Sequence, residues 1–149
     1  MINYYKSAER TLSARPDLDR ALENLKARKE AVLLRGRPQG MRTADTTRPY
    51  ISEGRVNDTL SSCVELAELD REIATTQATI EGIDRALDQL PEAEAAVLRA
   101  WYIDKATKEQ IADRLNYASA TTVYTLKNRG VAAFAVLYFG AGALGSTRN

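Results

Sequence analysis

Hydrogen-bonding side chains recur on one side of a predicted helix that begins near residue 120. They belong to Thr121, Thr122, Tyr124, Thr125, Lys127 and Asn128. Hydroxyl, amide and ammonium groups of this kind can bond the edges of bases or the oxygens of phosphates. From Ser119 onward there are three basic residues, Lys127, Arg129 and Arg148, and no acidic one, a net charge of +3 in a chain whose total is +1. The pattern indicates that this face contacts DNA.

A short helix is predicted immediately upstream, over residues 107–115. Thr107 can accept a hydrogen bond from the free amides of the first helical turn, and Glu109 and Asp113 favour the positive end of that helix. An apolar stripe at helical spacing gives the helix one buried face. The stripe is formed by Ile111, Ala112 and Leu115.

The second helix is predicted to begin near Ala120. The apolar period breaks at residues 116–118, and Ser119 then offers a new N-cap. An inward face resumes at positions i, i+3 and i+7, with Val123, Leu126 and Gly130. Two helices at this spacing form a helix-turn-helix, whose second helix enters the major groove of duplex DNA. The alternative is a small helical domain whose threonine-rich face is merely polar.

The predicted DNA-binding residues fall into two groups. Side chains that can read base edges are Thr121, Thr122, Tyr124, Thr125 and Asn128, and Ser119 at the start of the recognition helix is a further predicted DNA contact. Cations that can bind phosphates are Lys108, Lys127 and Arg129.

Residues 90–131 resemble the C-terminal promoter-reading domain of bacterial sigma factors. A helix start is marked by Pro91 between Leu90 and two glutamates. The likeness rests on the Leu-Pro-x-x-Glu opening, the Val97-Leu98 and Trp101-Tyr102 pairs, Ile111-Ala112-x-x-Leu115, and Thr122-Val123. The turn at residues 116–120 is about one residue longer than the usual form, and the recognition helix has fewer Arg and Lys. Promoter recognition therefore does not carry over directly.

Most of the chain is similar to phage late-gene transcription activators of the ArpU/RinA type, which prophages of Gram-positive bacteria encode. Residues 123–144 carry this likeness, whereas the N-terminal part fits loosely. The resemblance implies a DNA-binding activator of packaging and structural genes, which acts with host RNA polymerase in the bacterial cytoplasm.

Enzyme chemistry has little support in the sequence. The 149 residues contain no histidine, which excludes Ser-His-Asp triads and Cys-His metal clusters. We predict no catalytic residue, no metal site and no cofactor. The single Cys63 excludes an intrachain disulfide and fits a reducing cytoplasm. The longest hydrophobic run, residues 131–139, is about half the length that spans a bilayer, so no membrane contact is expected.

The first half, residues 1–89, is predicted to be a coiled-coil-like helical hairpin in an all-α fold. Its first helix is expected from Asp17 to Leu34, after a separate turn or two over residues 4–12, and a mobile basic loop over residues 35–57 follows. The loop region can touch phosphates, because residues 26–55 carry eight basic and three acidic side chains. A heptad seam marks the second helix, with Leu66, Ile73, Ile80 and Leu87 and their partners Leu69, Ile83 and Leu90.

The sequence leaves open what the heptad seam pairs with and which class of protein the chain belongs to. The seam can pair with the first helix of the same chain or with a second copy in a homodimer. Residues 90–149 form the predicted helix-turn-helix domain, and a dimer would read two half-sites. A small-terminase-like DNA-packaging component also combines a helix-turn-helix with a coiled segment. A helical adaptor that binds only protein is the third interpretation.

Overall fold

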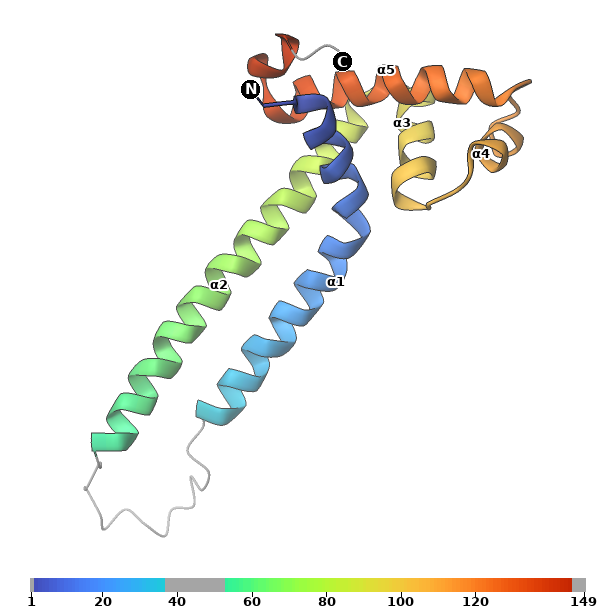
Figure 1. Ribbon diagram of the computed structural model, residues 1–149. Coiled ribbons are helices and arrows are strands. Elements are labelled where there is room, and N and C mark those ends of the chain that lie inside the picture. Colours follow the sequence, from blue (N-terminus) through green and yellow to red (C-terminus); the bar gives the residue numbers. More distant parts are fainter. Residues whose placement is uncertain (1, 37–52, 146–149) are drawn as a thin grey trace. The chain divides into compact units, whose positions relative to one another are not determined.

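The computed structural model describes residues 2–36 and 53–145, and those residues form helices joined by short connections (Figure 1). No strand occurs in these two stretches, so the predicted all-α class is confirmed. The chain forms two compact units, Met1–Asp19 with Ala78–Asn149, and Arg20–Gln77. The units do not coincide with the division predicted at residue 90, because the start of α1 and the end of α2 pack with the C-terminal helices.

The first helix, α1 (Tyr4–Gly36), is continuous through Pro16. The predicted new start at Asp17 is therefore wrong. A proline removes one backbone donor and usually breaks a helix, but α1 is held by burial on both sides of it: Leu12 is fully buried and Leu18 packs against the same core. Tertiary packing here overrides the local rule.

The second helix, α2 (Glu53–Asp88), begins earlier than expected. The predicted loop over residues 35–57 is too long, since residues 35–36 end α1 and residues 53–57 belong to α2. Residues 37–52, with most of the basic loop, lie outside the described residues. Contact of that loop with phosphates stays a prediction.

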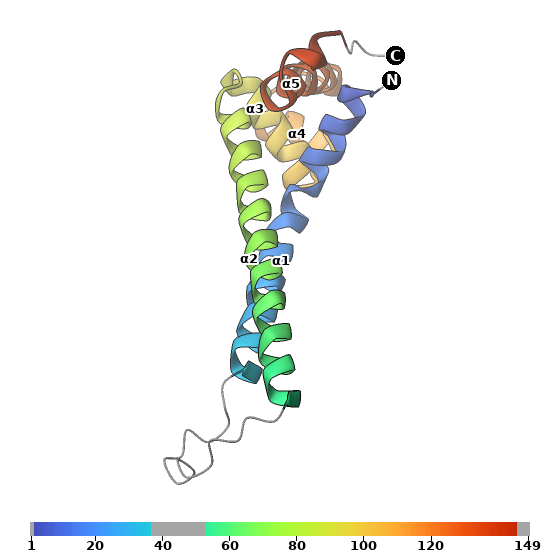
Figure 2. The same cartoon turned by 90° about the vertical axis from the view of Figure 1, so that its left-hand side faces the viewer.

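The unit Arg20–Gln77 is an antiparallel helical hairpin made from the later part of α1 and the earlier part of α2 (Figure 2). Its two helices enclose Val32 and Leu69, and ion pairs join Lys29 to Asp70 and Arg35 to Glu65, each at 2.6 Å. In this unit the seam residue Leu69 is therefore buried within the hairpin, whereas Ile83, Leu87 and Leu90 belong to the core of the other unit. The side chains of Leu33, Leu34, Leu60 and Val64 remain exposed.

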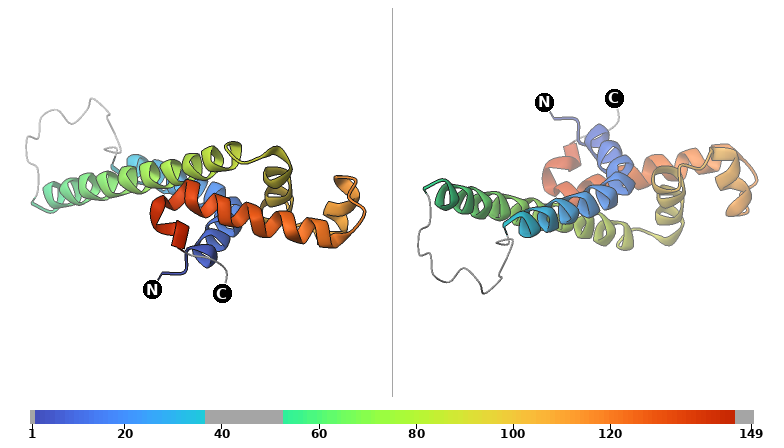
Figure 3. Two further views of the ribbon diagram at one scale, coloured as in Figure 1. Left: turned by 90° about the horizontal axis from the view of Figure 1, so that it is seen from above. Right: turned by 90° about the horizontal axis from the view of Figure 1, so that it is seen from below.

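The other unit has its core where α5 (Ala120–Phe139) passes over the first turns of α1 and the last turns of α2 (Figure 3). Leu12, Ile83, Leu87 and Phe134 are fully buried there. Gly140 ends α5 with φ of 90°, and η3 (Ala141–Gly145) follows as a short 3-10 turn. The apolar end of α5 is buried at Val131, Phe134 and Ala135, while Leu137 is exposed.

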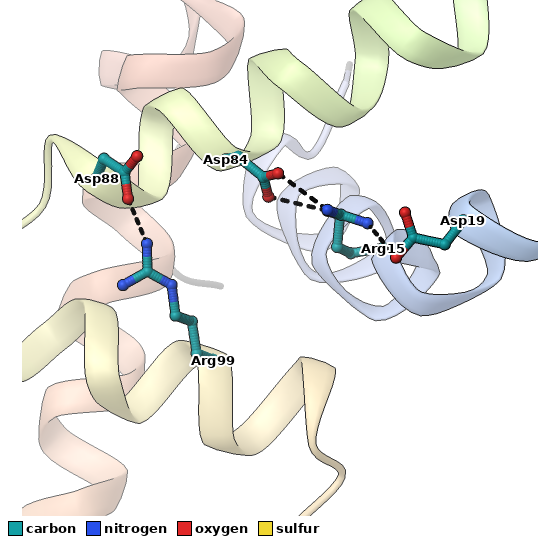
Figure 4. Close-up of polar contacts among 5 residues, drawn as sticks. All are labelled: Arg15, Asp19, Asp84, Asp88 and Arg99. Atoms are coloured by element: carbon teal, nitrogen blue, oxygen red, sulfur yellow. Dashed lines mark hydrogen bonds and ion pairs between the residues drawn. The ribbon is translucent and has the colours of Figure 1, made fainter. Parts of the chain in front are cut away.

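Ion pairs fix the helices around this core (Figure 4). The Arg15 guanidinium donates two hydrogen bonds of 2.9 Å to the Asp84 carboxylate and lies 2.7 Å from Asp19. Hydrogen bonding to Asp84 raises the pKa of Arg15 above its usual range. Arg99 pairs with Asp88 through a single contact, so α2 is tied both to α1 and to the segment that follows α3. Bidentate geometry of the Arg15 kind fixes orientation as well as distance.

Candidate DNA-binding interface

The helix that supports the interface begins where the sequence indicates. Pro91 occupies the N-cap position of α3 (Glu92–Leu98), and Glu92 and Glu94 lie in its first turn. The chain then continues as a π-helical turn, η2 (Arg99–Ile103). Val97 and Leu98 are fully buried against the helices that follow, so α3 is a platform for them.

The first helix of the helix-turn-helix, α4 (Lys108–Arg114), starts with a reciprocal cap. The Gln110 amide donates to the Thr107 hydroxyl at 3.2 Å, and the Thr107 amide donates to the Gln110 side-chain oxygen at 3.0 Å. The predicted cap at Thr107 is thus confirmed. The predicted inward residues Ile111 and Ala112 are buried against Val97 and Val123. Lys108 is exposed at the start of the helix.

The turn between the two helices depends on Asn116, whose φ of 60° lies in the left-handed region. Asparagine tolerates that conformation better than most residues. The Tyr117 amide donates to the Ala112 carbonyl at 2.9 Å and closes the turn. Ser119 is the N-cap of α5 as predicted, but its hydroxyl makes no capping hydrogen bond. That hydroxyl is exposed beside the first amides of the recognition helix.

The first turns of α5 present a polar face to solvent. Val123 is fully buried, which orients the helix, and the side chains on the other side are exposed: Thr121, Thr122, Tyr124, Thr125 and Arg129. The Thr125 hydroxyl donates to the Thr121 carbonyl at 3.0 Å and keeps its lone pairs for a further partner. Apart from Ser119 and Asn128, six residues of α5 are predicted DNA contacts, and five of them lie on this exposed face; Lys127 is the exception.

Lys127 does not face outward. Its side chain is 8% exposed, and Nζ lies 3.5 Å from Oε1 of Glu9. The ammonium also sits over two aromatic rings, 5.0 Å from the centroid of Trp101 and 4.8 Å from that of Tyr124. Position 127 follows Val123 by four residues, so both lie on the buried side of α5. The prediction of an outward Lys127 was based on polarity and is wrong.

Asn128 lies at the border between the buried and exposed sides. It is half-buried, and the Tyr5 hydroxyl donates to its Oδ1 at 2.8 Å. Glu9, one turn further along α1, also accepts a hydrogen bond of 2.9 Å from the Tyr102 hydroxyl. Burial, reinforced by the bond to Glu9, raises the pKa of Tyr102 above its usual range. The first turns of α1 thus hold the recognition helix from one side.

Sequence reasoning missed this contribution of α1. Tyr5 and Glu9 are four residues apart and share a helix face. That spacing indicates that this face contacts another segment of the protein. Nothing local identifies α5 as the partner, because 123 positions separate Tyr5 from Asn128.

In residues 2–36 and 53–145 no group of three or more His, Cys, Asp or Glu side chains could hold a metal ion. None of the helices described there is long and apolar enough to cross a membrane.

Comparison with known proteins gives a family match to this part of the chain. The family described as Protein of unknown function (DUF1492) matches residues 57–135, which is 79 of the 149 residues and more than half of the chain. The matched range contains most of α2, all of α3 and α4, and α5 as far as Ala135. Neither the curated proteins nor the solved structures contained a significant match.

Proposed function

We propose that this chain, which belongs to the DUF1492 family, is a sequence-specific DNA-binding regulator of transcription. The observation that carries the proposal is the exposed face at the start of α5. Three threonines, a tyrosine and an arginine project there from a helix that α3 and α4 support from behind. The described residues from Ser119 to Gly145 include no carboxylate that would repel phosphates.

In this proposal α5 enters the major groove. Thr121 and Thr122 offer hydroxyls that donate to or accept from base edges, the Thr125 hydroxyl can accept from them, and Tyr124 adds a phenol. Asn128 contributes through its amide nitrogen, because Tyr5 already occupies its Oδ1.

The phosphate contacts come from other groups. Lys108 at the start of α4 and Arg129 on α5 are exposed cations that fit this role, and the free Ser119 hydroxyl lies at the helix N-terminus, where anions are favoured. Lys127 has a different role: it braces Tyr124 and Trp101 from the buried side.

The regulator is proposed to be a phage late-gene activator of the ArpU/RinA type. This finer assignment is supported by the sequence resemblance over residues 123–144. It places the chain in the bacterial cytoplasm, where it would recruit host RNA polymerase to promoters of packaging and structural genes.

A homodimer is proposed on a separate observation. Within the hairpin unit, large apolar side chains at four positions are between 46% and 58% exposed: Leu33, Leu34, Leu60 and Val64. A second copy would remove them from water. Mass measurement in solution separates the functional classes, since a monomer or dimer fits the regulator and a ring-sized oligomer fits a small-terminase-like packaging component.

The test of the function is selection of duplexes from a random pool, followed by sequencing. A defined motif is expected for the parent chain. Thr125→Ala should change the preferred base at one position, because it removes a hydroxyl from the exposed face. Thr76→Ala is the matched control, since the Thr76 hydroxyl likewise donates to the carbonyl four residues earlier, at 2.8 Å from Glu72, but lies in the hairpin unit.

The same experiment can contradict the proposal. Retention of no duplex at low salt would leave a protein-binding adaptor as the function. Retention without sequence preference, or an equal effect of Thr125→Ala and Thr76→Ala, would remove the assigned base contacts.

A further inference from the structure

We propose that α1 carries a second phosphate-binding site, formed by Lys6 and Arg10 with Lys105 at its edge, which binds the DNA backbone beside the recognition helix. The proposal rests on the proposed DNA-binding function. It adds residues far from the helix-turn-helix in sequence to the surface that contacts DNA.

The site is an open groove along one face of α1. It has a volume of about 530 Å³ and is lined by Lys6, Glu9, Arg10, Ser13, Ala14 and Asp17. Lys105, from the connection before α4, reaches this face and donates from Nζ to the Ser13 carbonyl at 3.1 Å. Cations from two separate segments of the chain therefore meet at the groove.

The acidic side chains in the groove are already engaged. Glu9 accepts from Tyr102 and pairs with Lys127. Asp17, at the far end, has an interaction of its own within the chain. Lys6 and Arg10 are exposed, and neither pairs with an acid among the described residues.

Their spacing strengthens the inference. Lys6 and Arg10 are four residues apart on a helix, so their side chains lie side by side and repel each other. An anion bound between them attracts both cations, so the net interaction at the site becomes favourable. An arginine and a lysine together suit a phosphate, to which arginine donates two hydrogen bonds and lysine adds a point charge.

The position of the groove identifies DNA as the source of the phosphate. Tyr5, the neighbour of Lys6, bonds Asn128 on the recognition helix at 2.8 Å. A helix with its side chains is about 10–12 Å across and the major groove is about 12 Å wide, so backbone phosphates run along the flanks of an inserted helix. Elements that flank α5 are therefore the ones placed to touch them.

Two elements flank α5 at different points. The Ile111–Ala112 side of α4 packs on it near Val123, and α1 contacts it near Asn128. Lys108 can bind phosphates on the α4 side of α5, and Lys6 with Arg10 can bind phosphates on the α1 side. The α1 cations thereby supply the charge that the buried Lys127 cannot supply.

The test is a salt series of binding to a duplex retained from the random pool. The double variant Lys6→Gln with Arg10→Gln should lower the slope of log affinity against log salt by about 2, because each lost phosphate contact removes about 0.9. At physiological salt this corresponds to a loss of about thirtyfold in affinity. The sequence preference should not change, since the site touches no base.

Two further variants make the test specific. Lys26→Gln with Arg28→Gln removes two exposed cations of α1 in the hairpin unit, so it controls for net charge and should leave the slope near that of the parent. Lys6→Arg with Arg10→Lys keeps both charges and should keep the slope. Unfolding curves of each variant verify that the fold is intact.

The outcomes separate this proposal from the proposed function. Specific binding with a slope that the double variant leaves unchanged would overturn the α1 site and leave the regulator intact. Equal slope changes for the double variant and the hairpin-unit control would overturn it as well. A parent chain that retains no duplex at low salt would contradict both.

Discussion

The Lys127 ammonium lies 3.5 Å from the Glu9 carboxylate across 118 positions of sequence, inside the unit that contains the recognition helix. The Lys127 side chain is 8% exposed and that of Glu9 is 34% exposed. Together with the aromatic rings of Trp101 and Tyr124, the pair connects α1, η2 and α5. The recognition helix is therefore positioned by residues outside the helix-turn-helix.

Lys127→Met should lower the free energy of unfolding by about 2–3 kcal/mol. Loss of one partner of a fully buried pair costs about 3–5 kcal/mol, and the partial exposure of Glu9 reduces that figure. Denaturant unfolding measures the loss. Lys108→Met, at an exposed position, should change stability by less than about 0.5 kcal/mol. Similar values for the two variants would show that the Glu9 pair adds nothing to stability.

Local signals account for what the sequence could predict. The cap at Thr107, the stripe at Ile111 and the break before Ser119 all depend on residues within one or two turns, and the structure has each of them. At Pro16 distant packing outweighs the local rule that predicts a helix break. At Lys127 the helical phase places the side chain on the buried side of α5 despite its charge.

The contribution of α1 to the interface was not predictable in this way. Tyr5 and Glu9 meet α5 only in the folded chain, through side chains whose partners are more than a hundred positions away. No period or cap in either segment encodes that pairing. Nor does a local pattern identify Lys6 and Arg10 as phosphate contacts, because that proposed role depends on the position of α1 beside α5.

Thr107→Ala and Ser119→Ala should differ although both remove a hydroxyl at an N-cap. Thr107 accepts a bond from Gln110, so its loss should cost about 1 kcal/mol of stability. Ser119 makes no capping bond, so its loss should be close to neutral. In duplex binding Ser119→Ala should lower the affinity, as expected for a free hydroxyl at the interface. Equal stability losses, measured by denaturant unfolding, would contradict the difference in capping.

Tyr5→Phe should remove one half-buried hydrogen bond and cost about 1 kcal/mol. It should also release Oδ1 of Asn128 and alter the sequence preference in duplex selection. Tyr4→Phe is the control, because the Tyr4 ring packs on Phe139 at 5.5 Å and its hydroxyl has no hydrogen-bond partner among the described residues. If both variants keep the stability and preference of the parent, Tyr5 does not position Asn128.

Gly130→Ala should destabilise the chain by about 1–2 kcal/mol, because α5 approaches α3 closely at this point. A Cβ at Gly130 would lie 3.1 Å and 3.2 Å from atoms of Leu98, which is fully buried, and 3.4 Å from Glu94. Overpacking of about 1–3 kcal/mol then exceeds the gain of up to about 1 kcal/mol from replacing glycine in a helix.

Gly82→Ala provides the comparison for that prediction. Its Cβ would meet only the Tyr138 ring, at 3.3 Å, and that ring is half-buried and can shift. The helix propensity of alanine should then offset the contact, so the variant should be neutral or slightly more stable than the parent. Thermal unfolding of both variants measures the difference. A stabilising effect of Gly130→Ala would contradict the close packing of α3 against α5 at Leu98. It would also contradict the role of α3 as a support for the recognition helix.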